Sequence, residues 1–226
     1  MSAPPLEISG VTMRFGGLKA LADFNLTMQA GELVGLIGPN GAGKTTAFNA
    51  IAGVYTPTEG DVLVAGERVN GLRPHDICAK GIARTFQNIR LFRQLTALDN
   101  VRIACHARAK SGFFDSLLLT ARHRNEEAHI LGRAEEYLAV MGLSHRRDEL
   151  SRNLPYGEQR RLEIARALAT GPKVLCLDEP AAGMNAAEKI ELLALIRSIR
   201  DRFGIAILVI EHDMRVVMGV SERMLV

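Results

Sequence analysis

An uninterrupted apolar run, residues 33–37, leads directly into a glycine-rich loop, residues 38–45 (GPNGAGKT). Such a short apolar run is typical of a strand buried on both faces of a parallel sheet. The loop fits the pattern G-x-x-x-x-G-K-[ST], and residues 44 to about 52 are compatible with a helix that stops at Gly53. A strand, a loop and a helix in this order predict an α/β fold organised around a phosphate-binding site.

The residue types of this loop have defined physical roles. Its glycines let successive backbone N–H groups turn inward around phosphate oxygens, and the N-terminus of the following helix adds partial positive charge. We expect Lys44 to reach the β- and γ-phosphates and the Thr45 hydroxyl to coordinate Mg²⁺. The segment therefore predicts binding of ATP with Mg²⁺ through Gly38, Pro39, Asn40, Gly41, Ala42, Gly43, Lys44, Thr45 and Thr46.

A second apolar run, residues 174–177, ends in Asp178 and Glu179. Because parallel strands bind ligands beyond their carboxyl ends, Asp178 is expected to lie beside the loop and hold Mg²⁺ directly or indirectly. Glu179 is the natural general base, able to orient and polarise a water in line with the γ-phosphorus. The alternative is a structural Asp-Glu-Pro turn, which the presence of the phosphate-binding loop disfavours.

The chain divides into regions that differ in the spacing of their apolar residues. Residues 1–87 and 158–226 alternate short apolar runs with turns or helices, whereas residues 88–157 carry apolar residues at near-helical spacing. We therefore expect one domain with a P-loop NTPase (RecA-like) core, an N-terminal antiparallel β layer and an inserted α-helical subdomain. Outside the loop region, the predicted strands are 6–13, 25–28, 61–64, 68–69, 82–86, 174–177 and 205–210, and the predicted helices are 157–169, 186–203 and one from about residue 214.

The composition limits the classes of partner that the chain is expected to bind. The formal charge is only +3, from 28 basic and 25 acidic residues, tryptophan is absent and aromatics are 5%, so no nucleic-acid partner is expected. The three cysteines are far apart without metal-ligand spacing, and the N-terminus lacks signal-peptide features. The longest apolar run is too short to span a bilayer. These features predict a cytoplasmic protein that reaches a membrane only through a partner.

One stretch is enriched in basic residues, with Asp99 as its only nearby acid. It can be read as a solvated basic face or as a docking surface for a membrane or an acidic partner. The residues concerned are Arg84, Arg90, Arg93, Arg102, Arg108 and Lys110.

Three further features complete a pattern: Gln87 after a predicted strand, a helix opening with LPYGEQRR at residues 154–161, and His212 after a buried run. With the loop and the Asp178 strand, these motifs resemble ABC-type ATPases in order and spacing, over essentially the whole chain. The resemblance implies that Gln87 touches Mg²⁺ and the attacking water, and that His212 contacts the γ-phosphate. A lone histidine in such a place is otherwise usually structural.

The same resemblance implies further contacts. Phe15 falls where the family stacks an aromatic ring on adenine, although a core phenylalanine is the competing interpretation. Residues 181–185 match the D-loop, which the family places across a head-to-tail dimer interface. Tyr156, Gly157 and Glu158 belong to the signature segment that contacts the nucleotide of the second subunit. Pro155 replaces the usual serine, which removes a hydroxyl and a backbone N–H.

Within the family, the signature form and residues 85–101 are similar to the ATP-binding subunits of branched-chain amino-acid importers. This resemblance implies permease subunits that contact the region after Gln87, including Arg90, Phe92 and Arg93. It also implies a second ATPase subunit, an indirect link to a solute-binding protein, and a peripheral location on the inner face of the cell membrane.

Alternative functions remain open. They are a soluble ABC ATPase acting on DNA or ribosomes, an importer for a related solute such as urea or amides, and a module that senses ATP but barely hydrolyses it. Family members continue beyond the point where this sequence stops, so the family's C-terminal end is expected to be missing, by truncation or because the chain is naturally short.

Overall fold

The computed structural model describes residues 3–39, 41–106, 121–211 and 223–225. The chain forms two compact units, the first comprising Met1–Gln87 with Pro172–Val226 and the second Asn88–Gly171. The boundaries expected from the sequence lie after residues 87 and 157, and the first boundary in the structure lies after residue 87. The second lies after residue 171 rather than residue 157, because the helix Tyr156–Ala169 packs on the other helices of the second unit.

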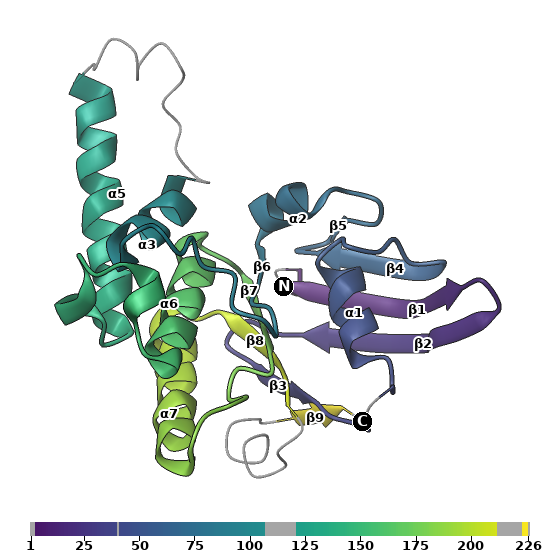
Figure 1. The fold of residues 1–226 in the computed structure, drawn as a ribbon. Coiled ribbons are helices and arrows are strands. Elements are labelled where there is room, and N and C mark those ends of the chain that lie inside the picture. The colour runs from purple at the N-terminus through teal and green to yellow at the C-terminus, as the bar shows by residue number, and fades with distance from the viewer. Residues whose placement is uncertain (1–2, 40, 107–120, 212–222, 226) are drawn as a thin grey trace. The chain divides into compact units, whose positions relative to one another are not determined.

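An antiparallel sheet forms one layer of the first unit (Figure 1). Its strands are β1 (Leu6–Phe15), β2 (Leu18–Met28), β4 (Glu59–Val64) and β5 (Glu67–Arg68), in the order β2-β1-β4-β5. Strand β2 begins seven residues before the segment predicted from the sequence at residue 25. None of residues 18–24 is fully buried and Leu21 interrupts their apolar alternation, so the sequence signal there is weak.

A parallel sheet forms the core of the same unit. Its strands are β3 (Leu33–Leu36), β6 (Ile82–Arg84), β7 (Val174–Asp178), β8 (Ala206–Ile210) and β9 (Arg223–Leu225), in the order β6-β7-β8-β3-β9. Every residue of β3, β7 and β8 is buried, which accounts for their uninterrupted apolar sequences.

The register of the parallel sheet brings the ends of its central strands together. Leu36 and Asp178 both pair with Ile210, at the last positions of β3, β7 and β8. The loop that follows β3 and the acidic residues that end β7 therefore lie at one edge of the sheet, as expected for a ligand-binding edge.

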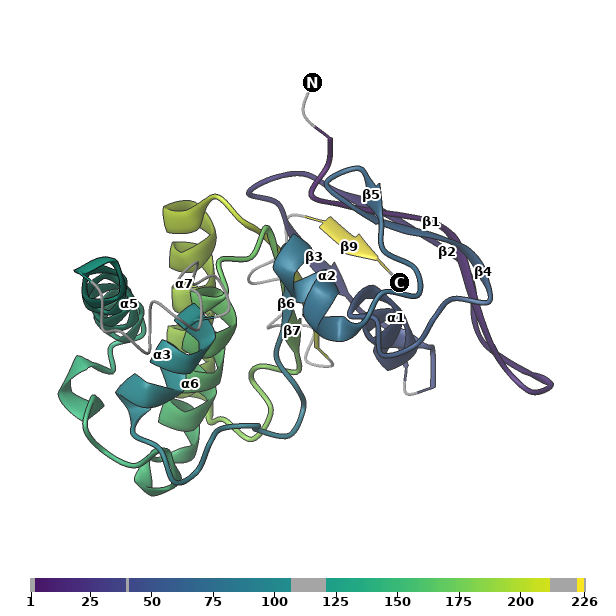
Figure 2. The same ribbon diagram turned by 90° about the horizontal axis from the view of Figure 1, so that it is seen from above.

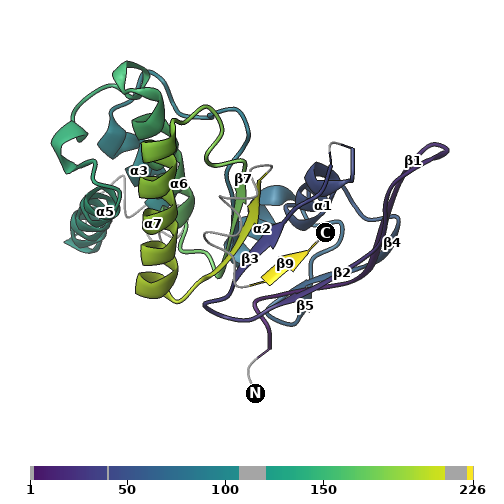
Figure 3. The ribbon, with the colours of Figure 1, turned by 90° about the horizontal axis from the view of Figure 1, so that it is seen from below.

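Helix α1 (Lys44–Ile51) lies between the two sheets (Figure 3). Its Phe48 and Ile51 are buried in a core that includes residues of both sheets, such as Met28 of β2 and Cys176 of β7. Burial of large apolar side chains of this kind contributes about 1.5–3 kcal/mol each. The core therefore fixes α1, and with it the start of the helix at Lys44.

Two other helices belong to the described part of the first unit. Helix α7 (Ala186–Phe203) has the predicted bounds and begins with a capping box, in which Asn185 Oδ1 accepts from the Glu188 N–H at 3.0 Å. Helix α2 (Pro74–Lys80) is absent from the sequence prediction. It is seven residues long and buries Ile77 alone, which is too little periodicity to recognise.

The second unit is helical, as expected (Figure 2). Helix α3 (Ala97–Cys105) packs against both α5 (Ala121–Val140) and α6 (Tyr156–Ala169), and two short 3-10 turns, η2 (Ser144–Arg146) and η3 (Ser151–Asn153), precede α6. Its core includes fully buried Val101 of α3, Leu138 of α5 and Leu162 of α6.

In the described part of the chain, no helix combines the length and the apolar character needed to cross a membrane. The predicted helix from about residue 214 lies outside the described residues.

Candidate nucleotide site

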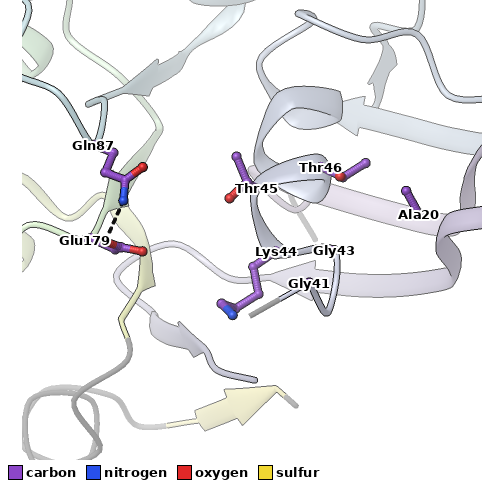
Figure 4. Close-up of a pocket in the computed structure, with 8 residues that line it drawn as sticks. All are labelled: Ala20, Gly41, Gly43, Lys44, Thr45, Thr46, Gln87 and Glu179. Atoms are coloured by element: carbon purple, nitrogen blue, oxygen red, sulfur yellow. Dashed lines mark hydrogen bonds between the residues drawn. The ribbon is translucent and has the colours of Figure 1, made fainter. Parts of the chain in front are cut away.

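A cavity of about 560 Å³ opens at the ligand-binding edge of the parallel sheet (Figure 4). On one side Lys44, Thr45 and Thr46 begin helix α1, and on the other Gln87 and Glu179 follow strands β6 and β7. The complete lining is Ala20, Gly41, Gly43, Lys44, Thr45, Thr46, Gln87 and Glu179. The structure thus brings together the predicted phosphate-binding loop, the predicted sensor glutamine and the predicted general base.

The last glycine of the loop is a position that only glycine can occupy. Gly43 is the N-cap of α1 with φ of 88°, in the left-handed region, and a Cβ there would lie 2.5 Å from the carbonyl oxygen of Ala20. The absence of a side chain lets the loop backbone pass beside β2 and turn directly into the helix. The N-terminus of α1 is then available to an anion with no side chain in between.

Lys44 supplies a buried positive charge to this loop. Its side chain curls back so that Nζ donates to the carbonyl oxygens of Gly38 at 2.7 Å and Pro39 at 2.8 Å, and the residue is 7% exposed. Among the described residues, no carboxylate forms an ion pair with it. A buried ammonium that is bonded only to neutral carbonyls has strong electrostatic affinity for an incoming anion.

Asp178 lies deeper than the cavity lining. Its Oδ2 accepts from Arg84 at 2.8 Å, its backbone N–H donates to Thr85 Oγ1 at 3.2 Å, and both charged side chains are buried. The same guanidinium donates to Asn49 Oδ1 of α1 at 2.6 Å. Arg84 therefore links the acidic end of β7 to the helix that carries Lys44 and Thr45.

This placement corrects one interpretation of the basic stretch. Arg84 belongs to the buried core beside the site, where it stacks on Phe48 and Phe86, and does not contribute to a solvated face or a docking surface. No local sequence pattern indicates this role, since the acidic partner of Arg84 is 94 residues away.

Glu179 has an unusual backbone conformation. Its φ is 46°, in the left-handed region, which costs a residue with a side chain on the order of 1–3 kcal/mol. Its N–H donates to the carbonyl oxygen of Ile210 at 2.9 Å, and its Oε2 accepts from Gln87 Nε2 at 3.1 Å. The backbone turn and the glutamine together direct the carboxylate into the cavity (Figure 4).

The oxygen-rich residues at this edge fit a magnesium ion. Thr45 offers a hydroxyl, Gln87 an amide oxygen and Asp178 a carboxylate, which are the hard donors that Mg²⁺ prefers. The described residues contain no cluster of three or more histidine, cysteine or acidic side chains suited to a metal. Since Mg²⁺ usually takes one or two protein carboxylates and completes its shell with phosphates and water, the sparse set is compatible with it.

Phe15 ends β1 with its ring 42% exposed. The ring meets Tyr55 edge to face, with centroids 5.2 Å apart and an interplanar angle of 76°. An exposed ring of this kind can stack on a planar ligand. The sequence does not predict the role of Tyr55, because an isolated tyrosine after a helix belongs to no motif.

The signature residues Tyr156, Gly157 and Glu158 belong to the second unit, where they form the first turn of α6. The Tyr156 ring is largely exposed and stacks with the Arg160 guanidinium. Glu158 forms an ion pair with Arg146 at 3.1 Å and is mostly buried.

Pro155 is the N-cap of α6 and provides no side-chain cap. The hydroxyl that the family usually has at this position could accept a hydrogen bond from a backbone amide of the first turn. Pro155 has no such acceptor in its side chain.

The chain that follows Gln87 is fastened to α6 within the second unit. The Arg90 N–H donates to Glu163 Oε1 at 3.2 Å, and the Arg90 carbonyl accepts from the guanidinium of Arg166, which also stacks on the exposed ring of Phe92. Of the predicted basic stretch, Arg90 and Arg93 are exposed, whereas Arg102 pairs with acids.

Four of the predicted residues, Asn40, Arg108, Lys110 and His212, lie outside the described residues.

The parallel sheet, the phosphate-binding loop and the facing acidic residues define a P-loop ATPase. Residues 21–182 match the ABC transporter family. The chain belongs to this family.

Comparison with individual proteins agrees with the family. The high-affinity branched-chain amino acid transport ATP-binding protein LivG of Escherichia coli (strain K12) is 47% identical over 226 residues, which are 100% of this chain and 89% of LivG.

Two solved structures are similar in fold. The ADP conformation of MJ1267, an ATP-binding cassette of an ABC transporter, has a TM-score of 0.81 and 30% identity, covering 96% of this chain and 85% of that one. The dimeric post-hydrolysis state of the ATP-binding cassette MJ0796, bound to ADP and Pi, has a TM-score of 0.78 and 26% identity, covering 95% and 91%.

Proposed function

We propose that this chain is the ATP-binding and ATP-hydrolysing subunit that energises an importer of branched-chain amino acids. The observation that carries the proposal is the 47% identity to LivG along the entire chain. The cavity supports the enzymatic part, because it places a cationic phosphate-binding loop opposite a carboxylate that can act as a base.

The loop and the N-terminus of α1 would bind the phosphates. The buried Lys44 ammonium, held by two carbonyl oxygens, would transfer its hydrogen bonds to phosphate oxygens, a stronger charge-assisted interaction. Phe15, which is partly exposed, would stack on adenine while its ring packs against Tyr55. The MJ1267 cassette, solved in an ADP conformation, supports a nucleotide as the ligand.

Mg²⁺ would be held by Thr45, Gln87 and Asp178, the last directly or through water. The ion supplies charge neutralisation at the phosphates when bound. Arg84 orients the buried Asp178 carboxylate, because its guanidinium donates to Oδ2 at 2.8 Å.

Glu179 would orient and polarise the attacking water. Its hydrogen bond with Gln87 directs the carboxylate into the cavity before the nucleotide arrives, which reduces reorganisation during the reaction. His212 would contact the γ-phosphate, as the family pattern implies.

A second ATPase subunit, identical or related, would complete each site in a head-to-tail dimer. Tyr156, Gly157 and Glu158 of one subunit would contact the nucleotide held by the loop of the other. The MJ0796 cassette, whose solved structure is dimeric, supports a dimer. Because the half-sites are on different chains, an isolated subunit would hydrolyse ATP slowly.

The transmembrane permease would dock on the region after Gln87. The exposed Phe92 ring and the exposed Arg90 and Arg93 offer apolar contact and positive charge there. A solute-binding protein would act indirectly through the permease, and the chain would be cytoplasmic and peripheral on the inner face of the cell membrane.

Reconstitution in proteoliposomes tests the proposal. The chain, its permease and a leucine-binding protein would be assembled, and ATP turnover measured with leucine, isoleucine or valine against urea, short amides and polar amino acids. Stimulation by the branched-chain set is expected, and Glu179→Gln would remove it. Stimulation by urea or amides alone would reassign the solute, and turnover without any permease or solute dependence would contradict a transport role.

A further inference from the structure

Glu211 is a buried acidic residue that the catalytic scheme does not use. It follows the last residue of β8, is 5% exposed, and its Oε1 accepts from the backbone N–H of Ala181 at 2.8 Å. Burying an ionisable side chain costs free energy unless hydrogen bonds compensate, so a buried carboxylate at this position suggests a specific structural role. Its partner Ala181 lies two residues after Glu179.

The segment that begins at Glu179 is a strained turn. Glu179 is in the left-handed region, and the turn continues with hydrogen bonds from the Ala182 N–H to the Glu179 carbonyl oxygen at 3.1 Å and from the Met184 N–H to the Ala181 carbonyl oxygen at 3.3 Å. A strained conformation persists only where the surroundings fix it on several sides.

Two bonds from the end of β8 fix this turn from outside. The Ile210 carbonyl oxygen accepts from the Glu179 N–H at 2.9 Å, and the Glu211 carboxylate accepts from the Ala181 N–H. The first bond extends the parallel ladder and needs no particular side chain. The second depends on the side chain of residue 211, which must present an acceptor oxygen within reach of Ala181.

We propose that Glu211 is a positioning residue that holds the Glu179 carboxylate in its hydrolytic geometry by anchoring the turn at Ala181. Without this anchor the turn relaxes toward an ordinary backbone conformation, and the Glu179 carboxylate leaves its place beside Gln87. Nucleotide binding should persist, because the residues proposed to hold the phosphates belong to the loop and to α1 and not to this turn. The inference rests on the proposed role of Glu179 as general base.

A pair of variants of similar side-chain length separates the hydrogen bond from packing. Glu211→Gln keeps an acceptor oxygen at the same reach, whereas Glu211→Met keeps the length and removes the acceptor. In the reconstituted complex at saturating Mg-ATP, Glu211→Met is expected to lower kcat by about 10- to 100-fold, the loss typical of a misplaced catalytic group. The affinity of this variant for a fluorescent ATP analogue should stay within about twofold of the wild-type affinity. Glu211→Gln should restore most of the turnover.

Hydrogen exchange gives a direct reading of the bond. The Ala181 amide should exchange slowly in the wild type and in Glu211→Gln, and at least tenfold faster in Glu211→Met. Glu211→Ser, which cannot reach Ala181, serves as a second variant if the methionine disturbs folding, and should behave in the same way.

The outcomes distinguish the two proposals. If Glu179→Gln retains turnover, the role of Glu179 is wrong and the inference is lost with it. If Glu179→Gln abolishes turnover but Glu211→Met and Glu211→Ser keep wild-type kcat or Ala181 protection, only the inference about Glu211 is overturned. An equal loss of kcat in Glu211→Gln and Glu211→Met would also overturn it, since the acceptor would then be irrelevant.

Discussion

Gln87 and Glu179, which are 92 residues apart in the chain, are hydrogen-bonded to each other at 3.1 Å from Nε2 to Oε2. The glutamine uses its amide nitrogen in this bond, so that its oxygen is the atom suited to a metal ion. The glutamate, in turn, has a carboxylate oxygen whose direction is fixed before any substrate binds. One bond thereby couples the proposed metal ligand to the proposed base.

Replacement of Glu179 by glutamine is expected to lower turnover by at least about 100-fold, because a general base contributes about 10²–10⁴ to the rate. ATP should still bind, since the phosphate-binding loop is unchanged. Steady-state hydrolysis and fluorescent-nucleotide binding measure the two effects. Glu59→Gln, at an exposed position in the antiparallel sheet, is the matched control and should keep wild-type turnover.

The buried pair of Arg84 and Asp178 should dominate the stability of the site. Arg84→Met leaves an unpaired buried carboxylate and is expected to reduce the free energy of unfolding by about 3–5 kcal/mol. Arg14→Met breaks the exposed pair with Glu59 and should cost less than about 1 kcal/mol. Urea titration of both variants measures the two reductions in the free energy of unfolding. Similar reductions would show that the buried Arg84 pair stabilises the fold no more than the exposed pair does.

The Cys176 thiol should make stability pH-dependent in alkaline solution. Complete burial raises the pKa of Cys176 to about 12 in the folded chain, whereas an exposed thiol titrates near 9. Below pH 9 both states hold the proton and stability is unaffected. Between about pH 9 and 12 only the unfolded state releases it, so the free energy of unfolding falls by up to about 1.4 kcal/mol per pH unit.

Cys176→Ala supplies the control for this pH effect, because other groups also titrate in alkaline solution. The difference in unfolding free energy between wild type and variant should be constant up to pH 9 and then shrink. A difference that stays constant to pH 11 would contradict the raised pKa.

Turnover of the isolated chain should depend steeply on protein concentration. Each complete site is proposed to need the phosphate-binding loop of one subunit and the signature segment of another, so specific activity rises as dimers form. Assays over a hundredfold range of concentration, with light scattering to count dimers, test this. A specific activity that is high and independent of concentration would favour a catalytically complete monomer.

The sequence was most informative where burial is complete. The apolar runs 33–37 and 174–177 predict strands correctly, because a strand buried on both faces is apolar throughout. The ends of these runs locate the phosphate-binding loop and Asp178. The helix predicted at 186–203 has the same bounds in the structure, where Asn185 caps its start and Gly204 its end.

It was least informative where structure depends on distant or exposed residues. The outer half of β2 and the helix α2 bury little, so no periodicity indicates them. Arg84 resembled any other surface arginine, since the carboxylate that holds it comes from another strand. The link from Glu211 to Ala181 likewise exists only after β7 and β8 have paired.

The attachment of the chain at Arg90 to helix α6 has a mechanical consequence. Glu163 and Arg166 hold that backbone at two successive points of the helix, roughly 10 and 15 Å from its first residue Tyr156 at about 1.5 Å per residue. An α-helix of this length bends little, so a displacement of the backbone at Arg90 should produce a similar displacement of Tyr156 and Gly157. The segment after Gln87 and the signature turn are therefore expected to move together as one rigid body.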